Sequence, residues 1–530
     1  MISLLLFFVS CSLVDEKITE PEQPGTSAVS DLYITLTLSL PNQVEETRAP
    51  ETNEDGNSGN YLGGAENEIK LETATLYLYD IHDNSDNRIV DFLYQESAPT
   101  KAPDPDATYK IVYKIPIKTF KLWSEKEYGL AIVGNEGKDY SGLSHNLISQ
   151  GMMNATFKLS NVEDLPIGDF GDEKNSEGQN VGKVMPLVNK SAIPIVFPKI
   201  EDGMTDEQII RFLETHFGRD EKNNNLKLLK DQVVELERAV ARIDVRDKDR
   251  GNESTPWVYQ IGQNDFKIKL HELQVFNVNS ISYLFRHTST DGTNISLFGI
   301  ENDKESALYT WIAGPDWSAS GGSFTKNADG LLNPLETENK EESKIINGIK
   351  VSNASYPGEI LIETLNSRSN TKDGYKPWCY VTENTIPSVD LMSEENRLDY
   401  ATGVAFTFQI LGTNGEALKY DDNGIYYPNG ITNATQANSI RLTDKAGNWI
   451  EVEPASDGNY YLTYYYFIRH NDPLSDKIDP MELAIVRNNV YELMVKSVSN
   501  LPNPNEPESY YLDVDIRVLS WVKHDVEVNW

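Results

Sequence analysis

Cysteine is almost missing from this chain, whose 530 residues include only Cys11 and Cys379. Cys11 belongs to an N-terminal signal that is described below, and a single remaining thiol cannot form an internal disulfide. Folding must therefore rest on buried apolar cores. Cys379 is followed by Tyr380 and Val381 in a strand-like run, so we interpret it as a small buried apolar group rather than a nucleophile.

Positive charge is also scarce. Lysine and arginine together number 47 against 82 aspartates and glutamates, which gives a formal net charge of −35. No basic stripe could neutralise phosphates, so we exclude nucleic acid as a partner, and the same excess of acid opposes adsorption to anionic lipid. The length supports two to three domains, and the 27 tyrosines among short apolar runs favour strands.

Catalytic and metal-binding patterns do not occur. The seven histidines are scattered, and none stands two or four residues from another, so a zinc site has no support. There is no Gly-rich phosphate loop, no G-x-S-x-G elbow and no Cys/His pairing. Two acidic segments, 83–87 and 421–424, could hold calcium, but their spacing is not that of an EF-hand and solvated turns are favoured. We predict no catalytic residue, metal or cofactor, and no enzyme.

The first ten residues are almost wholly apolar and lead to Cys11. The run is too short to span a bilayer as a stable helix, so we interpret residues 1–10 as the remnant of a signal peptide. Val9-Ser10-Cys11 looks like the end of a bacterial lipobox, in which Cys11 becomes lipidated. The alternative is a chance cysteine in an ordinary signal peptide. A polar, Pro-rich, acidic tether follows, and we predict a lipidated propeptide over residues 11–48 of an exported protein.

The propeptide contains the clearest strand signal in the chain, at residues 31–41. Apolar and polar residues alternate strictly there, which indicates one face buried in a sheet. Polar segments without core residues flank this strand on both sides. The apolar positions of this leader strand are Leu32, Ile34, Leu36, Leu38 and Leu40.

A lone arginine, Arg48, follows in the acidic linker between residues 41 and 64. No arginine precedes it, and the next one along the chain is Arg88. A protease can reach a flexible linker, so a trypsin-like or arginine-specific protease has one obvious site, between Arg48 and Ala49. The alternative is an ordinary solvated surface arginine.

Residues 49–250 are predicted to form a first β domain with one short amphipathic helix. Thr205 can cap that helix, and Ile209, Ile210 and Leu213 supply its apolar face. In a later strand-like run, Arg238 and Arg242 are interpreted as covering a sheet face. The polar tract 246–255 marks the boundary between the domains. The predicted strands are 69–79, 89–94, 109–120 and 128–135.

Residues 251–530 are predicted to form a second β domain, with surface loops around residues 318–350. Its strands are expected near 266–276, 378–382, 404–411, 460–468 and 481–498. The segment 510–530 alternates again, and an extended apolar strand at a terminus needs a partner. We interpret it as a donor strand, with apolar positions at Val514, Ile516, Val518, Trp521, Val526 and Val528.

The leader strand, Arg48 and the terminal strand together suggest polymerisation. If the leader strand completes a sheet, its removal after Arg48 leaves unpaired edges that form a template for another strand. The terminal strand of a second copy could fill that groove. Because donor and groove lie on different surfaces, the contact is head-to-tail and extends into a filament.

Four segments resemble the fimbrillins of Bacteroidales, which build type V pili, and most of all stalk subunits of the minor-fimbrium type. The resemblance extends over nearly the whole chain. Its segments are Thr47-Arg48-Ala49 after an alternating strand, Leu236–Ile243, Cys379–Thr385, and Val486–Leu493 together with the terminal strand through Val518-Leu519-Ser520-Trp521.

This resemblance implies an all-β fold of two tandem transthyretin-like β-sandwich domains. It also implies export as an outer-membrane lipoprotein and removal of the leader by an arginine-specific protease, which maps to Arg48. The mature chain then joins a cell-surface fimbrium by C-terminal strand exchange. Expected partners are other copies head-to-tail and accessory fimbrial subunits, in a structure that supports adhesion.

Two alternatives to a stalk subunit stay open. A tip subunit would need a groove but no donor strand, and an anchor would donate a strand without losing its leader. A reading from another class is a glycan-binding surface lipoprotein that uses exposed aromatics such as Trp311, Trp317 and Tyr464–Tyr466. Tyrosines and phenylalanines that alternate along strands are more often sheet packing.

Overall fold

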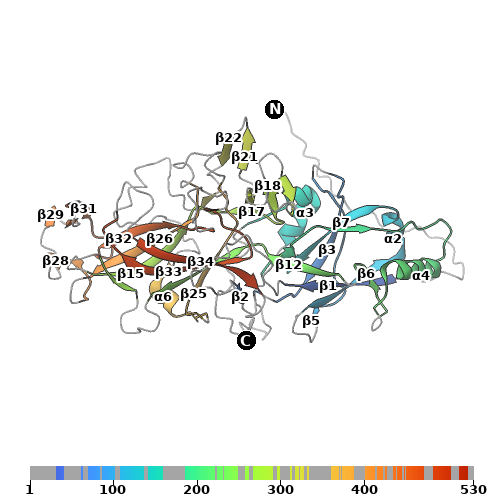
Figure 1. The fold of residues 1–530 in the computed structure, drawn as a ribbon, viewed down its shortest axis with the longest axis horizontal. Coiled ribbons are helices and arrows are strands. Elements are labelled where there is room, and N and C mark those ends of the chain that lie inside the picture. The colour runs from blue at the N-terminus through green and yellow to red at the C-terminus, as the bar shows by residue number, and fades with distance from the viewer. Residues whose placement is uncertain are drawn as a thin grey trace, which may run out of the picture.

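The computed structural model describes a predominantly β protein (Figure 1). The described residues are 31–40, 61–63, 68, 70–83, 86–101, 108–135, 141–158, 185–220, 224–230, 232–248, 257–261, 267–289, 295–298, 311–312, 317–320, 323–326, 331–332, 360–368, 370–371, 373–386, 400–411, 415–421, 424–426, 434–436, 439–443, 447, 449–470, 482–502 and 512–522. The all-β fold class predicted from the sequence is confirmed. The division into two transthyretin-like sandwiches stays a prediction.

A ten-stranded sheet forms one end of the long axis of the molecule (Figure 1). Its order is β4-β3-β7-β9-β12-β1-β6-β5, with β10 paired to β7 and β11 paired to β1. The strands are β1 Asp31–Ser39, β3 Ala74–Tyr79, β4 Ile89–Leu93, β5 Thr100–Lys101, β6 Tyr109–Pro116, β7 Glu127–Gly134, β9 Leu187–Asn189, β10 Ile193–Val196, β11 Leu226–Lys227 and β12 Val233–Arg238.

Helices accompany this sheet. The predicted helix is present as α4, Asp206–Phe217: the Thr205 side chain accepts from the Gln208 backbone and the Gln208 side chain accepts from the Thr205 backbone, a complete capping box. A second helix corrects the predicted strand 109–120, because β6 ends at Pro116 and α2 begins at the next residue. α2 spans Ile117–Trp123. The other described helices are α3 Ser141–Asn154 and, in the later part of the chain, α6 Ile362–Asn366.

Two five-stranded sheets form the later part of the chain. The order of one is β2-β34-β33-β13-β25, and in the other β14-β15-β26-β32 run in sequence with β24 paired to β15. The predicted strand 481–498 begins later than expected, at Asn489. The strands are β2 Tyr61–Gly63, β13 Ala241–Asp247, β25 Lys376–Val381, β33 Asn489–Val498, β34 Leu512–Val522, β14 Val258–Gln260, β15 Lys267–Phe276, β24 Ile360–Leu361, β26 Gly403–Leu411 and β32 Tyr461–Phe467.

Short strands form small separate sheets, and three of them lie in the segment 318–350 or reach into it, where surface loops were predicted. The three are β21 Trp317–Ser320, β22 Ser323–Lys326 and β23 Leu331–Leu332. The other short strands are β8 Thr156–Lys158, β16 Val278–Asn279, β17 Ile281–Tyr283, β18 His287–Ser289, β19 Ile295–Leu297, β20 Trp311–Ile312, β27 Lys419–Asp421, β28 Gly424–Tyr426, β29 Ala434–Gln436, β30 Ser439–Thr443 and β31 Trp449–Val452.

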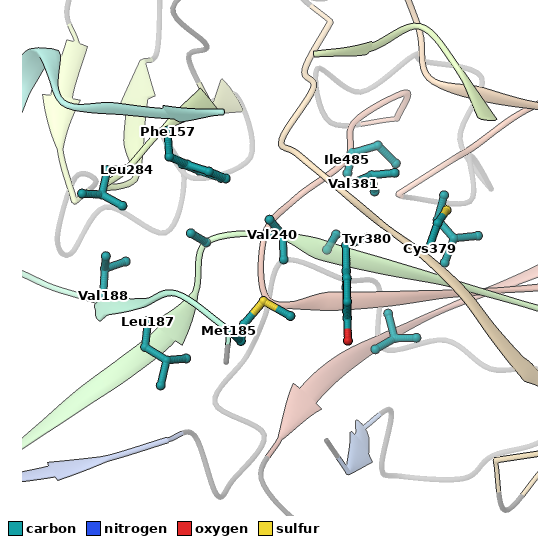
Figure 2. Packing of buried hydrophobic residues seen from close by; sticks show 14 of the residues in the cluster. Phe157, Met185, Leu187, Val188, Val240, Leu284, Cys379, Tyr380, Val381 and Ile485 are labelled. Atoms are coloured by element: carbon teal, nitrogen blue, oxygen red, sulfur yellow. The ribbon is translucent and has the colours of Figure 1, made fainter. Parts of the chain in front are cut away.

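The chain passes between sheets through two residues. β12 belongs to the ten-stranded sheet and β13 to a five-stranded one, and only Ala239 and Val240 separate them. Figure 2 shows Val240 between Val188 and Leu187 on one side and Tyr380 on the other. One apolar cluster runs through this junction and includes residues of both sheets. The chain therefore crosses between the sheets at residues 239–240, earlier in the sequence than the tract 246–255, where we predicted the domain boundary.

Candidate functional site: the leader groove, the terminal strand and the junction

The predicted leader strand, β1, lies inside the ten-stranded sheet. It pairs antiparallel with β6 along its length, from Asp31 opposite Pro116 to Leu38 opposite Tyr109. Its other edge pairs in parallel with β11 and then with β12. Both edges of β1 are thus hydrogen-bonded, and β1 is the link between β6 and the rest of the sheet.

The apolar side chains of β1 fill the core of this sheet. Their exposed fractions are 7% or less, as the alternating pattern predicted. Opposite them, inward-facing residues of β6 such as Ile111 and Tyr113 are fully buried. The buried leader residues are Leu32, Ile34, Leu36, Leu38 and Leu40. Without β1, a groove lined by apolar side chains would open between β6 and β11–β12.

The opposite face of β1 is polar, and charged side chains line it. Lys114 Nζ lies 2.9 Å from Asp31 Oδ2. The pKa of Lys114 is raised, mainly by this hydrogen bond and by the Asp31 charge. The Thr35 hydroxyl accepts from Asn225 at 3.1 Å, and Lys110 Nζ lies 3.4 Å from Asp220 Oδ2.

The predicted donor strand has a partner in its own chain. β34 pairs antiparallel with β33, from Leu512 opposite Val498 to Ser520 opposite Asn489, with a register shift between Val495 and Ser497. The other edge of β34 pairs with β2 through residues 520–522 alone among its described residues. The terminal strand was expected to need a partner, and its own chain supplies one on each side, with the short β2 as the outer neighbour.

β34 is held less deeply than β1. Leu512 and Leu519 are buried, but the predicted donor residues Val514, Ile516 and Val518 are only half-buried against the core. They lie opposite or beside β33 residues such as Val495, which pairs with Val514. Fewer apolar atoms leave water in β34 than in β1, so less free energy opposes its detachment.

Charged side chains attach β34 to its neighbours. Asp515 Oδ1 lies 3.3 Å from Lys496 Nζ, and the Arg517 guanidinium pairs with Asp373 at 3.2 Å and with Glu492. Burial raises the pKa of Glu492 to about 7, although the Arg517 charge acts in the opposite direction. The Glu492 side chain has no exposed surface, so its desolvation is the cause we place first.

A buried ion network occupies the junction between the sheets. Arg242 Nη1 donates to both carboxylate oxygens of Glu68 at 3.0 and 2.8 Å, and its other nitrogens donate to Asp244 at 2.8 Å. The Tyr380 hydroxyl donates to Glu68 at 2.7 Å. Arg238 Nε donates to the Glu68 carbonyl oxygen at 3.0 Å. We predicted that Arg238 and Arg242 cover a sheet face; they are instead 0% and 2% exposed.

A second buried ion network includes Glu237 of β12 and Arg487, which comes just before β33. The fully buried Arg487 donates to Glu383 Oε2 at 2.6 Å and to the carbonyl oxygens of Leu284 and Tyr283, each at 2.6 Å. Glu237 of β12 pairs with Arg286 at 2.6 Å. Burial raises the pKa of Glu237 against the effect of these arginines.

Three of the sequence segments that suggested the family resemblance lie together at this junction. Residues 236–243, 379–385 and 486–493 meet here, because β13 pairs antiparallel with β25 and parallel with β33. Sequence reasoning missed the roles of Glu68, Glu383 and Arg487. A charged residue within an apolar strand run was the available signal, but its partners lie up to 312 residues away.

Several predicted site residues lie outside the described part of the chain. These are Cys11, Arg48, Ala49, Val526 and Val528. Trp521 is described only through its backbone, which pairs with Leu62 of β2. Lipidation, cleavage and the last part of the donor strand therefore stay predictions.

The remaining predictions concern buried groups and metal. Cys379 is a free, buried thiol whose pKa is raised by burial. Among the aromatics suggested for sugar binding, Tyr464 is fully buried and Tyr465 is 8% exposed, which leaves little surface for stacking. The described residues contain no cluster of three or more metal ligands, and Asp421 pairs with Gly424 in a hairpin. None of the described helices has the length and hydrophobicity to cross a membrane.

One comparison with known proteins matches the C-terminal part of the chain to a protein family. Residues 457–527, which contain all of β33 and β34, match the family model described as major fimbrial subunit protein type IV, fimbrillin, C-terminal. This stretch of the chain is therefore similar to the C-terminal part of fimbrillins, as the sequence resemblance suggested. The match is to structural subunits, in agreement with the prediction that the chain is not an enzyme. No curated protein matches.

Solved structures show a distant similarity along most of the chain. A candidate cell adhesion protein from Parabacteroides distasonis is 13% identical with a TM-score of 0.42, covering 94% of this chain and 100% of that one. The fimbrilin fimA from Porphyromonas gingivalis is 13% identical with a TM-score of 0.37, covering 93% and 99%. The tip fimbrial protein Mfa3 from Porphyromonas gingivalis is 11% identical with a TM-score of 0.31, covering 93% and 100%. Similarities this low carry no inference about function.

Proposed function

We propose that this chain is a stalk subunit of a cell-surface fimbrium, and that it polymerises by exchanging β1 for the terminal strand of another copy. The observation that carries the proposal is the position of β1: a strand that precedes Arg48 fills the interior of a sheet formed by residues that follow it. Cleavage after Arg48 would cut the only covalent link between β1 and that sheet.

The groove left by β1 would provide the driving force for assembly. Burying five aliphatic side chains at about 1.5–3 kcal/mol each contributes on the order of 7–15 kcal/mol before backbone hydrogen bonds are counted. An empty groove would expose this surface together with two unpaired strand edges. A strand of alternating apolar residues from another chain recovers most of that free energy, less the cost of ordering it.

The terminal segment is the strand proposed to fill the groove. β34 already pairs antiparallel with β33, as β1 does with β6, so it has the backbone geometry that the groove requires. Donation requires β34 to leave β33 and β2, and its half-buried side chains make that step less costly than extraction of β1. Since the groove and β34 lie on different sheets, each added subunit presents a new groove or a new strand.

The finer parts of the proposal concern the precursor. A lipid on Cys11 would hold the exported precursor at the outer membrane until an arginine-specific protease separates residues 11–48 from the remainder. Accessory fimbrial subunits would begin and end the filament, which would support adhesion. The Pro-rich, acidic composition of residues 12–30 supports an extended tether between the lipid and β1.

Controlled proteolysis tests the proposal. The purified full chain is treated with an arginine-specific protease and followed on unheated gels, on which strand-exchanged polymers migrate as ladders. The wild type should change from monomer to ladder, whereas deletion of residues 510–530 should leave a soluble monomer. A truncated chain that still forms ladders would contradict the donor assignment.

A reversible lock tests the same step without truncating the fold. Val495 and Val514 are opposite residues on β33 and β34, so the double variant V495C/V514C can hold β34 in place with a disulfide. The oxidised variant should remain monomeric after proteolysis, and reductant should restore ladders. Ladder formation by the oxidised protein would refute donation by β34. The single variants V495C and V514C are the matched controls.

A further inference from the structure

The solvent-facing side of the β1 groove has an ordered pattern of charge. Going along β1, Lys114 lies opposite Tyr33 on the β6 edge, and Lys227 lies opposite Thr35 on the β11 edge. Further on, Glu235 of β12 lies opposite Ser39. Basic groups thus line the groove as far as Thr37, which lies opposite Lys110, and an acid lies at its end, in a chain whose net charge is −35.

The outer face of β34 has the complementary pattern. Its polar residues are Asp513 and Asp515, followed by Arg517. β1 offers only Asp31 to the same lysines, through the exposed pair with Lys114. The incoming strand therefore has two acids where the leader strand has one.

We propose that Lys114 and Lys227 recognise the donor strand and set its register, with Asp513 opposite Lys114 and Asp515 opposite Lys227. This inference rests on the proposed function, because it concerns the same groove. In this register Leu512 takes the position of Leu32. Val514, Ile516 and Val518 then take the positions of Ile34, Leu36 and Leu38.

Slipping forward by two or by four residues is unfavourable. With Val514 at the position of Leu32, Arg517 would lie opposite Lys227. With Ile516 at that position, Arg517 would lie opposite Lys114. Like charges directly opposite each other on a sheet are destabilising.

The proposed register places Arg517 at the position of Thr37, opposite Lys110. The Lys110 ammonium already pairs with Asp220 at 3.4 Å, which reduces its repulsion of the guanidinium. The neighbouring edge position holds Val233, and Glu235 lies two residues further along the same strand. The charged positions of β34 thus favour this one alignment.

A charge-reversal cycle in the full chain tests the pairing. Asp513 is exposed in the monomer, so D513K changes the donor without disturbing the subunit. After proteolysis, K114E and D513K should each slow ladder formation about five- to tenfold, and K114E/D513K should return it to within about twofold of the wild type. K118E, an exposed lysine on α2, is the matched control for the change of charge.

Whether K114E slows or speeds ladder formation distinguishes recognition of the donor strand from a weaker hold on the leader strand. K114E also removes the pair with Asp31, so a role limited to holding the leader strand predicts faster ladder formation. Slower formation that D513K reverses supports recognition; unchanged or faster formation overturns it. Deletion of residues 510–530 is run in parallel. If only the charge cycle fails, the register is wrong and strand exchange stands, whereas ladders from the deletion variant refute both.

Cross-linking tests the register directly. In the polymer, K114C/D513C should form a disulfide between subunits under oxidising conditions, because these positions are opposite each other. K114C/D515C should not, since it would require the two-residue slip. The reverse result would overturn the proposed alignment.

Discussion

Arg242 and Glu68 form a buried ion pair 2.8 Å apart, although 174 residues separate them in the sequence. Arg242 belongs to β13, at the start of the later sheets, and Glu68 precedes β3 of the ten-stranded sheet. Their side chains are 3% and 0% exposed. Buried pairs of this kind contribute little over an apolar pair, but loss of one partner leaves a charge without its counterpart in the interior.

Glu68→Gln should therefore lower the free energy of unfolding by about 2–3 kcal/mol, since Arg242 loses the charge of one of the two carboxylates it pairs with, Glu68 and Asp244. Urea denaturation followed by tyrosine and tryptophan fluorescence measures the change. Glu72→Gln is the control, because its pair with Lys70 is exposed and is worth less than about 1 kcal/mol. Equal losses in the two variants would show that the buried network has no special role.

Glu492 should make stability depend on pH. Its pKa is about 7 in the folded chain against 4.5 for an ordinary glutamate, so the folded state binds the proton more tightly. The stability from this group is fully present below pH 4.5 and is lost as pH rises through 7. The wild type should lose on the order of 1–3 kcal/mol relative to Glu492→Gln over this interval.

Urea titrations at several pH values between 4.5 and 8 measure how the free energy of unfolding of the wild type and of Glu492→Gln changes with pH, and the two slopes are compared. Asp373→Asn removes the more exposed partner of Arg517 and should retain the slope of the wild type. Parallel stability curves for the wild type and Glu492→Gln would show that the buried carboxyl does not titrate in this range.

Leu36→Ala should loosen the leader strand. Leu36 is 1% exposed, and a buried leucine truncated to alanine costs about 2–5 kcal/mol. The uncut variant should unfold at lower urea. After proteolysis its leader should leave sooner, and ladders should form at least about tenfold faster if departure limits the rate. Tyr33→Ala, on the solvent-facing side and 39% exposed, should change both measurements little.

Arg48→Gln should keep the protein monomeric in the presence of the arginine-specific protease, because the leader strand remains covalently attached. N-terminal sequencing of the wild type should begin at Ala49. Arg88→Gln is the control: the Arg88 carbonyl oxygen accepts a hydrogen bond from Asp80, so cleavage there requires local unfolding. If Arg48→Gln still forms ladders, cleavage at another site or no cleavage at all drives assembly.

Local patterns predicted the elements whose structure depends on nearby residues. The alternation over residues 32–40 predicted β1 and its buried face, and Thr205 predicted the start of α4. α2 was missed because Ile117 continues the alternation of β6. The spacing of Ile117, Phe120 and Trp123 is helical, and all three are buried, so Pro116 followed by that spacing was the available signal.

Long-range pairing determined what the sequence could not predict. The run from Arg238 to Val245 looks like one continuous strand, yet it divides between two sheets at Ala239 and Val240. Both of its faces are buried because partners for Arg238 and Arg242 come from distant segments. The position of β34 has the same origin: a terminal strand needs a partner, but its own sequence does not show that β33 supplies it.

The two-residue connection between β12 and β13 has a mechanical consequence for a filament. β12 borders the groove, and β13 pairs with β33, the present neighbour of β34. Tension that enters a subunit at its groove and leaves near its terminal strand would follow buried backbone through Ala239 and Val240, with no long loop to extend. Ladders of hydrogen bonds loaded along the strands resist in shear, and a fibre built this way would stretch little before its subunits separate.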